Sequence, residues 1–285
     1  MTAGLGTRGS GLGNRISRRF AELHAHKRTA LIPFVTAGDP TPDATPALMH
    51  ALVDAGADLI ELGMPFSDPM ADGPVIQHAD ERALRNRVGI VDILRWVREF
   101  RERDAETPVV LMGYLNPLEV RGIEHFAREA ADAGVDGVLV VDCPIEEDAV
   151  LQPLRDEGLR RILLVAPTTS DARLGRAVAA AEGYLYYVSF AGITGAGKLS
   201  TVDIASRVAD LRRRAAVPVA VGFGIRDAAS ASAIADFADA VVIGSALVAQ
   251  LATSVDAGDA CRLARRFLAP IRAALDRRQG VEINE

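Results

Sequence analysis

An acidic residue within an apolar segment is the first sign of chemistry in this sequence. Glu61 lies between Ile60 and Leu62 in a short run that reads as a strand. A carboxylate buried without a partner is costly enough that it tends to take up a proton. An ion pair with an arginine of another strand is the structural alternative, but the predicted strands supply little arginine besides Arg161. We therefore interpret Glu61 as a functional carboxyl group.

The proline-rich segment 64–74, which follows Glu61, supplies further carboxylates. Asp68 precedes a proline and could accept a hydrogen bond in a turn, whereas Asp72 precedes Gly-Pro and could cap the next helix. A carboxyl group kept protonated in an apolar pocket can act as a general acid, while a better solvated carboxylate stays ionised as a base. Glu61 and one of the two aspartates could form such a pair, and spacing alone does not rank them.

Glycines at the ends of two later predicted strands indicate an anion site. One strand runs into the segment 222–225, which holds Gly222 and Gly224, and the next runs into Gly244 and Ser245 at the apparent start of a helix. Backbone N–H groups at such positions can approach a phosphate, and a helix N-terminus adds positive potential. Either turn alone could be a plain connection, but the two together favour phosphate.

A third glycine-rich segment, 192–199, nearly matches the P-loop of nucleotide hydrolases. Leu199 stands directly after Lys198, where a P-loop needs Ser or Thr to hold magnesium. We interpret the segment as a lid, in which Thr194 could reach a catalytic carboxylate and the Gly195 amide could face phosphate. A plain flexible loop is the alternative.

The remaining polar residues narrow the reaction. A Schiff-base aldolase needs a lysine near a strand end, whereas Lys27 precedes the first predicted strand and Lys198 lies in a loop. A zinc aldolase needs clustered ligands, and the five histidines all lie away from strand ends. Acid/base catalysis by carboxylates on a phosphorylated substrate remains, provided that the substrate can itself accept the electrons released by cleavage. A protonated indole ring would do so.

A barrel is the architecture that would bring these residues together. Beyond Arg28 the chain alternates aliphatic runs with longer helical segments, and eight such units close a (β/α)8 TIM barrel. An open doubly wound sheet is the structural alternative. We predict one barrel domain over 15–285 that starts with an N-terminal helical segment, preceded by a flexible Gly-rich leader over 1–14. The predicted strands are 29–35, 58–63, 108–113, 136–142, 161–166, 184–190, 217–222 and 239–244.

Composition excludes several classes of protein. The 285 residues carry a net charge of −6 with 5% aromatic residues, which argues against a nucleic-acid partner. No stretch approaches the ~20 apolar residues of a membrane span. Two cysteines, Cys143 and Cys261, are too few for a disulfide framework or a metal site. These features predict a cytoplasmic protein that acts on small metabolites.

The sequence resembles the tryptophan synthase alpha chain family. The matching segments are 31–40, 61–74, 192–195, 222–225 and 244–245, in the same order, and the second is highly specific. The resemblance extends from about residue 15 to the C-terminus. It implies a (β/α)8 barrel and a lyase of tryptophan biosynthesis, which cleaves indole-3-glycerol phosphate to indole and glyceraldehyde 3-phosphate by a retro-aldol step.

The resemblance also implies roles for individual residues. Glu61 is similar to the general acid/base at indole C3 and the glycerol hydroxyl, Asp72 to the carboxylate at the indole nitrogen, and Tyr186 to an active-site tyrosine. The remaining positions resemble the indole pocket (Phe34, Met112 and Leu139), the phosphate cradle (Gly195, Gly224, Gly244 and Ser245) and the lid threonine (Thr194).

A partner is implied as well. The family works with a beta chain that carries pyridoxal phosphate, in an alpha-beta-beta-alpha heterotetramer, and needs no cofactor or metal in the alpha chain. The beta-facing surface would include the loop around Asp68 and the segment 114–117. Three alternatives remain open: another phosphate-binding barrel enzyme of amino-acid biosynthesis, a regulatory subunit without chemistry of its own, and a P-loop nucleotide hydrolase.

Overall fold

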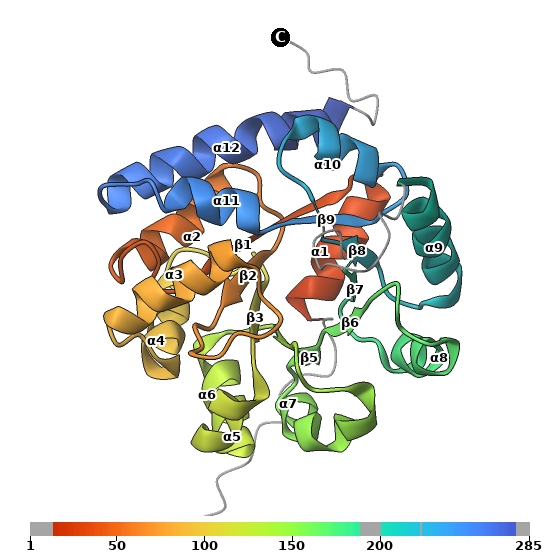
Figure 1. Ribbon diagram of the computed structural model, residues 1–285, viewed down its shortest axis with the longest axis horizontal. Helices are drawn as coiled ribbons and strands as arrows, with labels where there is room; N and C mark the ends of the chain where they lie inside the picture. Colours follow the sequence, from red (N-terminus) through yellow and green to blue (C-terminus); the bar gives the residue numbers. More distant parts are fainter. Residues whose placement is uncertain (1–13, 189–200, 223, 278–285) are drawn as a thin grey trace, which may run out of the picture.

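A ring of parallel strands occupies the centre of the molecule, and helices surround it (Figure 1). This computed structural model describes residues 14–188, 201–222 and 224–277, so the predicted leader lies outside the described residues except for Asn14. Within these ranges, nine strands follow the order β5-β4-β3-β2-β1-β9-β8-β7-β6. They are β1 (Ala30–Thr36), β2 (Ile60–Gly63), β3 (Val109–Gly113), β4 (Gly137–Val140), β5 (Arg160–Arg161), β6 (Leu163–Val165), β7 (Leu185–Tyr187), β8 (Val219–Val221) and β9 (Ala240–Ile243).

The fifth predicted strand is divided into β5 and β6. β5 pairs with β4, whereas β6 pairs with β7, so this one stretch of chain joins the two ends of the sheet. Between them, the Ile162 amide still donates to the Val138 carbonyl at 3.0 Å. The prediction of a (β/α)8 barrel is therefore confirmed, and the open doubly wound sheet is wrong.

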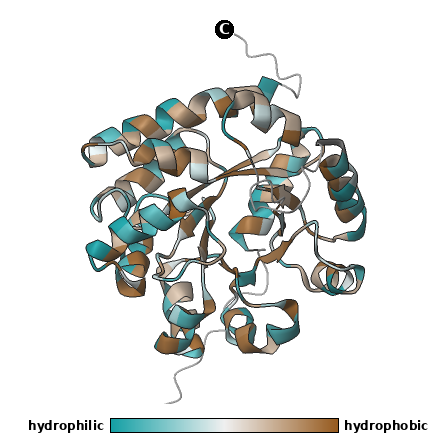
Figure 2. Cartoon of the chain, viewed as in Figure 1, coloured by the Kyte–Doolittle hydropathy of each residue, from teal (hydrophilic) through white to brown (hydrophobic). Residues whose placement is uncertain are grey.

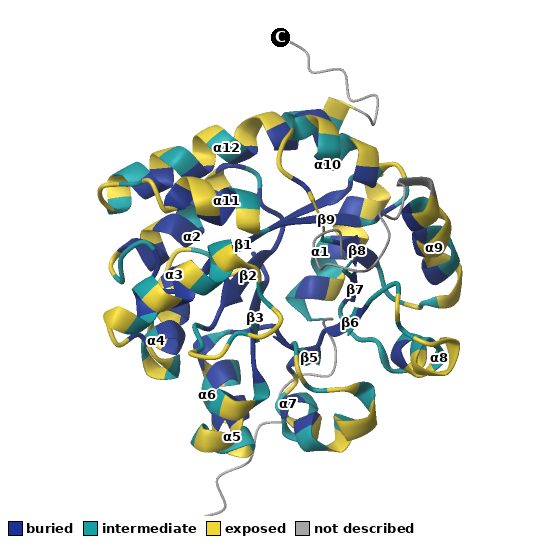
Figure 3. Cartoon of the chain, viewed as in Figure 1, coloured by how far each residue is buried: buried dark blue, intermediate teal, exposed yellow. Residues whose placement is uncertain are grey.

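Helices cover the outer side of the barrel (Figure 1). Their inner sides are buried against the strands, while their outer sides are exposed (Figure 3) and hydrophilic (Figure 2). No helix among the described residues combines the length and apolar character that a membrane span requires. The helices are α1 (Arg15–Ala25), α2 (Ala44–Asp54), α3 (Pro74–Arg85), α4 (Ile90–Arg101), α5 (Leu115–Arg121), α6 (Ile123–Ala133), the 3-10 helix η1 (Ile145–Leu151), α7 (Gln152–Asp156), α8 (Asp171–Ala180), α9 (Thr201–Arg214), α10 (Ala228–Ala235), α11 (Ser245–Leu251) and α12 (Ala257–Arg277).

The two-residue period of the strands divides the core into an outer and an inner part. Alternate side chains of one strand point to opposite faces, so Ile60 and Leu62 pack outward while Leu59 points into the barrel. The inner core is closed at one end by α1, which begins after the N-cap Asn14 and contributes Ile16, Phe20 and Leu23. The members of the inner core on the strands include Ile32, Val110, Leu139, Ile162, Ala220 and Val242.

Three aspartates hold the N-terminal ends of the strands. Asp58, Asp136 and Asp239 each stand just before a strand and accept a hydrogen bond at 2.9 Å from a backbone amide of the neighbouring strand. Each also pairs with an arginine of the surrounding helices: Asp58 with Arg272, Asp136 with Arg101, and Asp239 with Arg212. These contacts attach the helical layer to the sheet, at the face of a barrel that mainly contributes stability.

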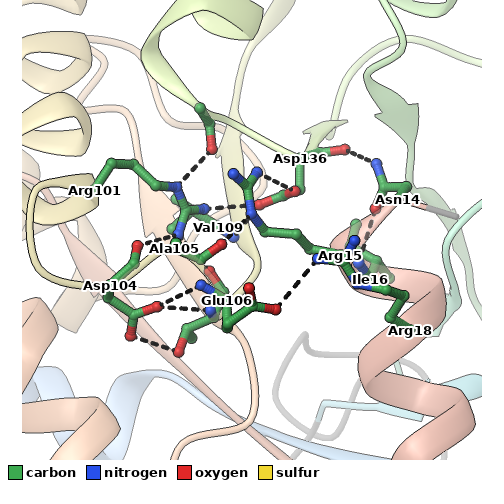
Figure 4. Close-up of polar contacts among 12 residues, drawn as sticks. Asn14, Arg15, Ile16, Arg18, Arg101, Asp104, Ala105, Glu106, Val109 and Asp136 are labelled. Atoms are coloured by element: carbon green, nitrogen blue, oxygen red, sulfur yellow. Dashed lines mark hydrogen bonds and ion pairs between the residues drawn. The ribbon is translucent and has the colours of Figure 1, made fainter. Parts of the chain in front are cut away.

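Asp136 is the most extensively bonded of the three. It lies between Arg101, at 2.8 Å, and Arg15 of α1, at 3.0 Å (Figure 4), and it is 3% exposed. Its backbone carbonyl also accepts a hydrogen bond from the Asn14 side chain. One carboxylate therefore connects α1, α4 and β3.

We expect the substitution Asp136→Ala to lower the free energy of unfolding by about 3 kcal/mol, because it leaves a buried arginine without its counter-charge. Urea denaturation followed by circular dichroism measures the change. Glu81→Ala is the matched control, since the Glu81 pair with Arg85 is exposed and should contribute less than about 0.5 kcal/mol. Equal effects of the two substitutions would contradict the role given to Asp136.

Candidate active site

The carboxyl group of Glu61 lies inside the barrel, entirely buried. Glu61 is paired in register with Phe34 of β1, and the hydroxyl of Tyr184 donates a hydrogen bond to its Oε1 at 2.5 Å. Its Oε2 has no hydrogen-bond partner among the residues that the structure describes. Burial raises the pKa of Glu61 to about 7, while the bond from Tyr184 acts in the opposite direction. Such a group can both donate and accept a proton near neutral pH.

The tyrosine that contacts Glu61 was not identified from the sequence. The sequence analysis selected Tyr186 of β7, whereas the bond comes from Tyr184, which immediately precedes that strand. Both tyrosines belong to the inner core, as expected for residues two positions apart. Burial, and then the charges of Glu61 and Asp72, raise the pKa of Tyr186 well above its usual range. Tyr186 therefore lies within electrostatic reach of both carboxylates.

Asp72 is held by a tyrosine and not by a helix end. The hydroxyl of Tyr114 donates to its Oδ2 at 2.6 Å and accepts a bond from the Ala71 amide at 3.0 Å. Helix α3 begins with Gly73 as its N-cap and has no side-chain cap, so the capping role considered for Asp72 is wrong. Asp72 is half-buried, and burial raises its pKa although Tyr114 lowers it.

Asp68 lies in a different environment. It is exposed, and its side chain accepts a hydrogen bond from the adjacent Ser67 hydroxyl at 2.6 Å. The structure thus separates the two aspartates that spacing could not rank: Asp68 is exposed, whereas Asp72 is half-buried and its charge acts on Tyr186 of the inner core.

The three residues assigned to an indole pocket come from β1, β3 and β4 and share an inward orientation. Phe34 and Leu139 are buried and Met112 is half-buried; Met112 pairs in register with Leu139 and with Gly63. Phe34 also packs with Ala79 of α3 and Val248 of α11. These side chains form an apolar wall beside Glu61, of a kind that suits an aromatic ring.

The two described glycines assigned to the phosphate site have different structural roles. Gly224 has φ +59°, a left-handed conformation that other residues rarely adopt, with open space where a side chain would be. Gly244 is the N-cap of α11 and Ser245 is its exposed first residue; the helix has no side-chain cap, which leaves its first amides available. Thr194 and Gly195 lie outside the described residues.

A buried aspartate of α3 also escaped the sequence analysis. Asp80 is 4% exposed, and burial, followed by repulsion from Asp72, raises its pKa to about 7. Its position on the same buried helix face as Ala79 and Ala83 is the signal that could have found it. The described residues include no cluster of three or more side chains suited to holding a metal ion.

Comparison with known proteins decides the family. The family model described as "Tryptophan synthase alpha chain" matches residues 20–270. The chain belongs to the tryptophan synthase alpha chain family. Alpha chains from Xylella fastidiosa (strain 9a5c) and Xanthomonas axonopodis pv. citri (strain 306) are 57% and 59% identical to it over 264 residues, which is 92% of this chain and 98% of each relative.

Solved structures agree with this result. Tryptophan synthase subunit alpha from Legionella pneumophila str. Paris has a TM-score of 0.87 and 43% identity, covering 93% of this chain and all of that one. Tryptophan synthase from M. tuberculosis in its aminoacrylate-bound form has a TM-score of 0.81 and 34% identity, covering 92% of this chain and all of that one. This chain is thus a tryptophan synthase alpha chain family member and a lyase of tryptophan biosynthesis that cleaves indole-3-glycerol phosphate.

The pKa of Glu61 predicts a pH dependence of stability. The pKa is about 7 in the folded alpha chain and near 4.5 when unfolded, so the folded state binds more protons between these values. The free energy of unfolding therefore falls as the pH rises from about 4.5 to 7, by about 3 kcal/mol for this group. We expect Glu61→Gln to be more stable than the unsubstituted chain at pH 8 and equally stable at pH 4. Urea titrations at the two pH values test this; a variant no more stable at pH 8 would contradict it.

A side chain added at Gly222 is predicted to disturb the candidate active site by steric overlap. A Cβ atom added at Gly222 would overlap the hydroxyl oxygen and the ring of Tyr186, so Gly222→Ala must displace that ring. We expect kcat/KM for indole release to fall at least about 100-fold, with circular dichroism unchanged, because a small displacement in an active site is costly. Gly175→Ala, in the open on α8, is the control. Normal turnover by Gly222→Ala would mean that the position of Tyr186 is unimportant.

Proposed function

We propose that Glu61 carries out the cleavage of indole-3-glycerol phosphate by proton transfer and that Asp72 stabilises the positive charge which forms at the indole nitrogen. The observation that supports this most directly is the state of Glu61: one carboxyl oxygen is held by Tyr184, the other has no partner among the described residues, and burial brings its pKa to about 7. A substrate atom in the barrel would face the free oxygen, which can donate a proton in one step and accept one in the next.

The retro-aldol reaction needs both abilities. Protonated Glu61 gives its proton to indole C3, which moves positive charge to the indole nitrogen. Ionised Asp72 stabilises that charge from the loop after β2. Glu61 then takes the proton of the glycerol hydroxyl, the carbon–carbon bond breaks as the aldehyde forms, and the bonding electrons return to the indole ring. Glu61 ends protonated, as it began, so the cycle closes.

The remaining site residues bind the substrate. Phe34, Met112 and Leu139 would line the indole ring and keep water away from Glu61, which maintains its raised pKa. At the other end, the amides around Gly224, Gly244 and Ser245 would bind the phosphate group, with Gly195 and Thr194 of the segment after β7 closing over it. Tyr186 would contact the part of the substrate between its indole ring and its phosphate group.

A beta chain is the expected partner, and one surface suits it. Met70 and Val120 are 85% and 82% exposed although both are large and apolar. Met70 belongs to the loop of Asp68, and Val120 to the helix that starts in the segment 114–117. Tyr114 connects this surface to the candidate active site. Its ring stacks on the ring of Phe66, with centroids 5.0 Å apart, and its hydroxyl donates a hydrogen bond to Asp72. We propose an alpha-beta-beta-alpha heterotetramer in the cytoplasm, with pyridoxal phosphate in the beta chain and no cofactor in this one.

An assay of indole release tests the reaction and the partnership together. We expect the purified chain to release indole from indole-3-glycerol phosphate, and to do so faster when a beta chain is added. Glu61→Gln should lower kcat between about 100-fold and 10,000-fold, the usual contribution of a general acid/base, with KM little changed because the binding contacts remain. Asp68→Asn is the matched control for loss of a carboxylate from the same region and should keep its kcat in the isolated chain. Full activity of Glu61→Gln would instead mean that Glu61 is not the acid/base of the cleavage.

A further inference from the structure

Helix α1 reaches the catalytic centre from the opposite end of the barrel. Its residue Phe20 is 6% exposed and belongs to the inner core (Figure 1 shows α1 within the ring of strands). The ring of Phe20 packs against the ring of Tyr184, with centroids 5.9 Å apart and planes inclined by 50°. The hydroxyl of the same Tyr184 donates to Glu61. One tyrosine therefore contacts α1 through its ring and the catalytic carboxyl group through its hydroxyl.

The backbone of Tyr184 is only partly constrained by the sheet. Tyr184 precedes β7, whose ladder pairs begin at Leu185 with Leu163 and Val219. The preceding residue, Gly183, has φ +63°, a left-handed backbone conformation that does not occur within a regular strand. The placement of the Tyr184 hydroxyl therefore depends on the packing of its ring more than on strand pairing.

Phe20 also lines a cavity among the residues that the structure describes. A cavity of about 870 Å³ lies at the N-terminal end of the barrel, and Phe20, Leu23 and Gly183 are among its lining residues. Tyr184 does not line this cavity and is fully buried. Phe20 thus contacts the ring of Tyr184 and also lines this cavity, whereas Tyr184 does not line it.

We infer that Phe20 is a positioning residue for the cleavage reaction. Its ring packs against the ring of Tyr184 and fixes the orientation of that side chain, so that the hydroxyl stays bonded to Oε1 of Glu61 and Oε2 remains available to the substrate. This inference rests on the proposed role of Glu61 as the acid/base. The other titratable groups that act on the centre are Tyr186 of β7 and Asp72 of the loop after β2. Without the phenyl ring, Tyr184 turns toward the cavity and Glu61 loses its one hydrogen-bond donor among the described residues.

The first test removes the ring and follows Glu61 directly. Phe20→Leu and Phe20→Met keep an apolar side chain of similar bulk, and Phe20→Tyr keeps the aromatic ring. We expect both ring-less variants to raise the pKa of Glu61, measured by NMR on chain labelled with 13C-glutamate and assigned with Glu61→Gln, because the bond from Tyr184 lowers that pKa. We also expect kcat to fall about tenfold, the usual effect of losing one charge-assisted hydrogen bond, with KM unchanged. Phe20→Tyr should restore both values.

Leu23→Ala is the matched control for damage to α1. Leu23 lies on the same buried helix face and lines the same cavity, but makes no ring contact with Tyr184. We expect this variant to lose thermal stability as the Phe20 variants do, with the pKa of Glu61 and kcat unchanged. If Leu23→Ala reproduced the effects of Phe20→Leu, Phe20 would have a structural role only and the inference would be overturned.

A double-mutant cycle decides whether Phe20 acts through the tyrosine. In the Tyr184→Phe background the hydroxyl is absent, so Phe20→Leu should have no further effect on the pKa of Glu61 or on kcat. Additive effects in the double variant would overturn the inference. The proposed function fails separately: if Glu61→Gln cleaves substrate normally, Glu61 is not the acid/base, whereas the NMR titration still measures the coupling of Phe20 to Glu61.

Discussion

Desolvation of the Glu61 carboxyl group is the constraint around which the active site is arranged. Among the described residues Glu61 accepts one hydrogen bond, from the Tyr184 hydroxyl, and its other neighbours are mostly apolar, so the charged form is disfavoured and the pKa rises to about 7. The same burial that would let the group act in the proposed proton transfer makes the folded chain less stable at neutral pH. A better-satisfied carboxylate would stabilise the fold and lose the ability to donate its proton, so stability and catalysis impose opposite requirements at this position.

Alternation along the strands explains why so many predicted site residues meet. Five strands each contribute one of these residues, and each side chain points into the barrel. The residues are Phe34, Glu61, Met112, Leu139 and Tyr186. The barrel could be predicted from the order of the apolar runs, which left an open sheet as the alternative, and the family resemblance selected the site positions on these strands. The division of the fifth strand could not be predicted, because it depends on pairing with two different neighbouring strands and does not change the local hydropathy pattern.

Contacts between distant residues account for what the sequence did not reveal about the site. Spacing left Asp68 and Asp72 equivalent, and the family resemblance separated them; in the structure the difference is the hydroxyl of Tyr114, 42 positions further along the chain. Tyr184 was missed because only its pairing with Glu61, 123 positions away, distinguishes it from Tyr186. Asp80 was missed because a lone aspartate on a helix reads as solvated until the packing of α3 is known. The assignments of Thr194 and Gly195 lie outside the described residues and stay predictions.

The aspartates at the N-terminal ends of the strands connect parts of the chain that are made at very different times. Asp58 precedes the second strand, yet its guanidinium partner, Arg272, belongs to the last helix, and both side chains are buried. During synthesis on a ribosome, which proceeds from the N-terminus, the strand that carries Glu61 emerges more than 200 residues before that counter-charge exists. Until α12 leaves the exit tunnel, the first half of the barrel holds an acidic group that it cannot bury at low cost.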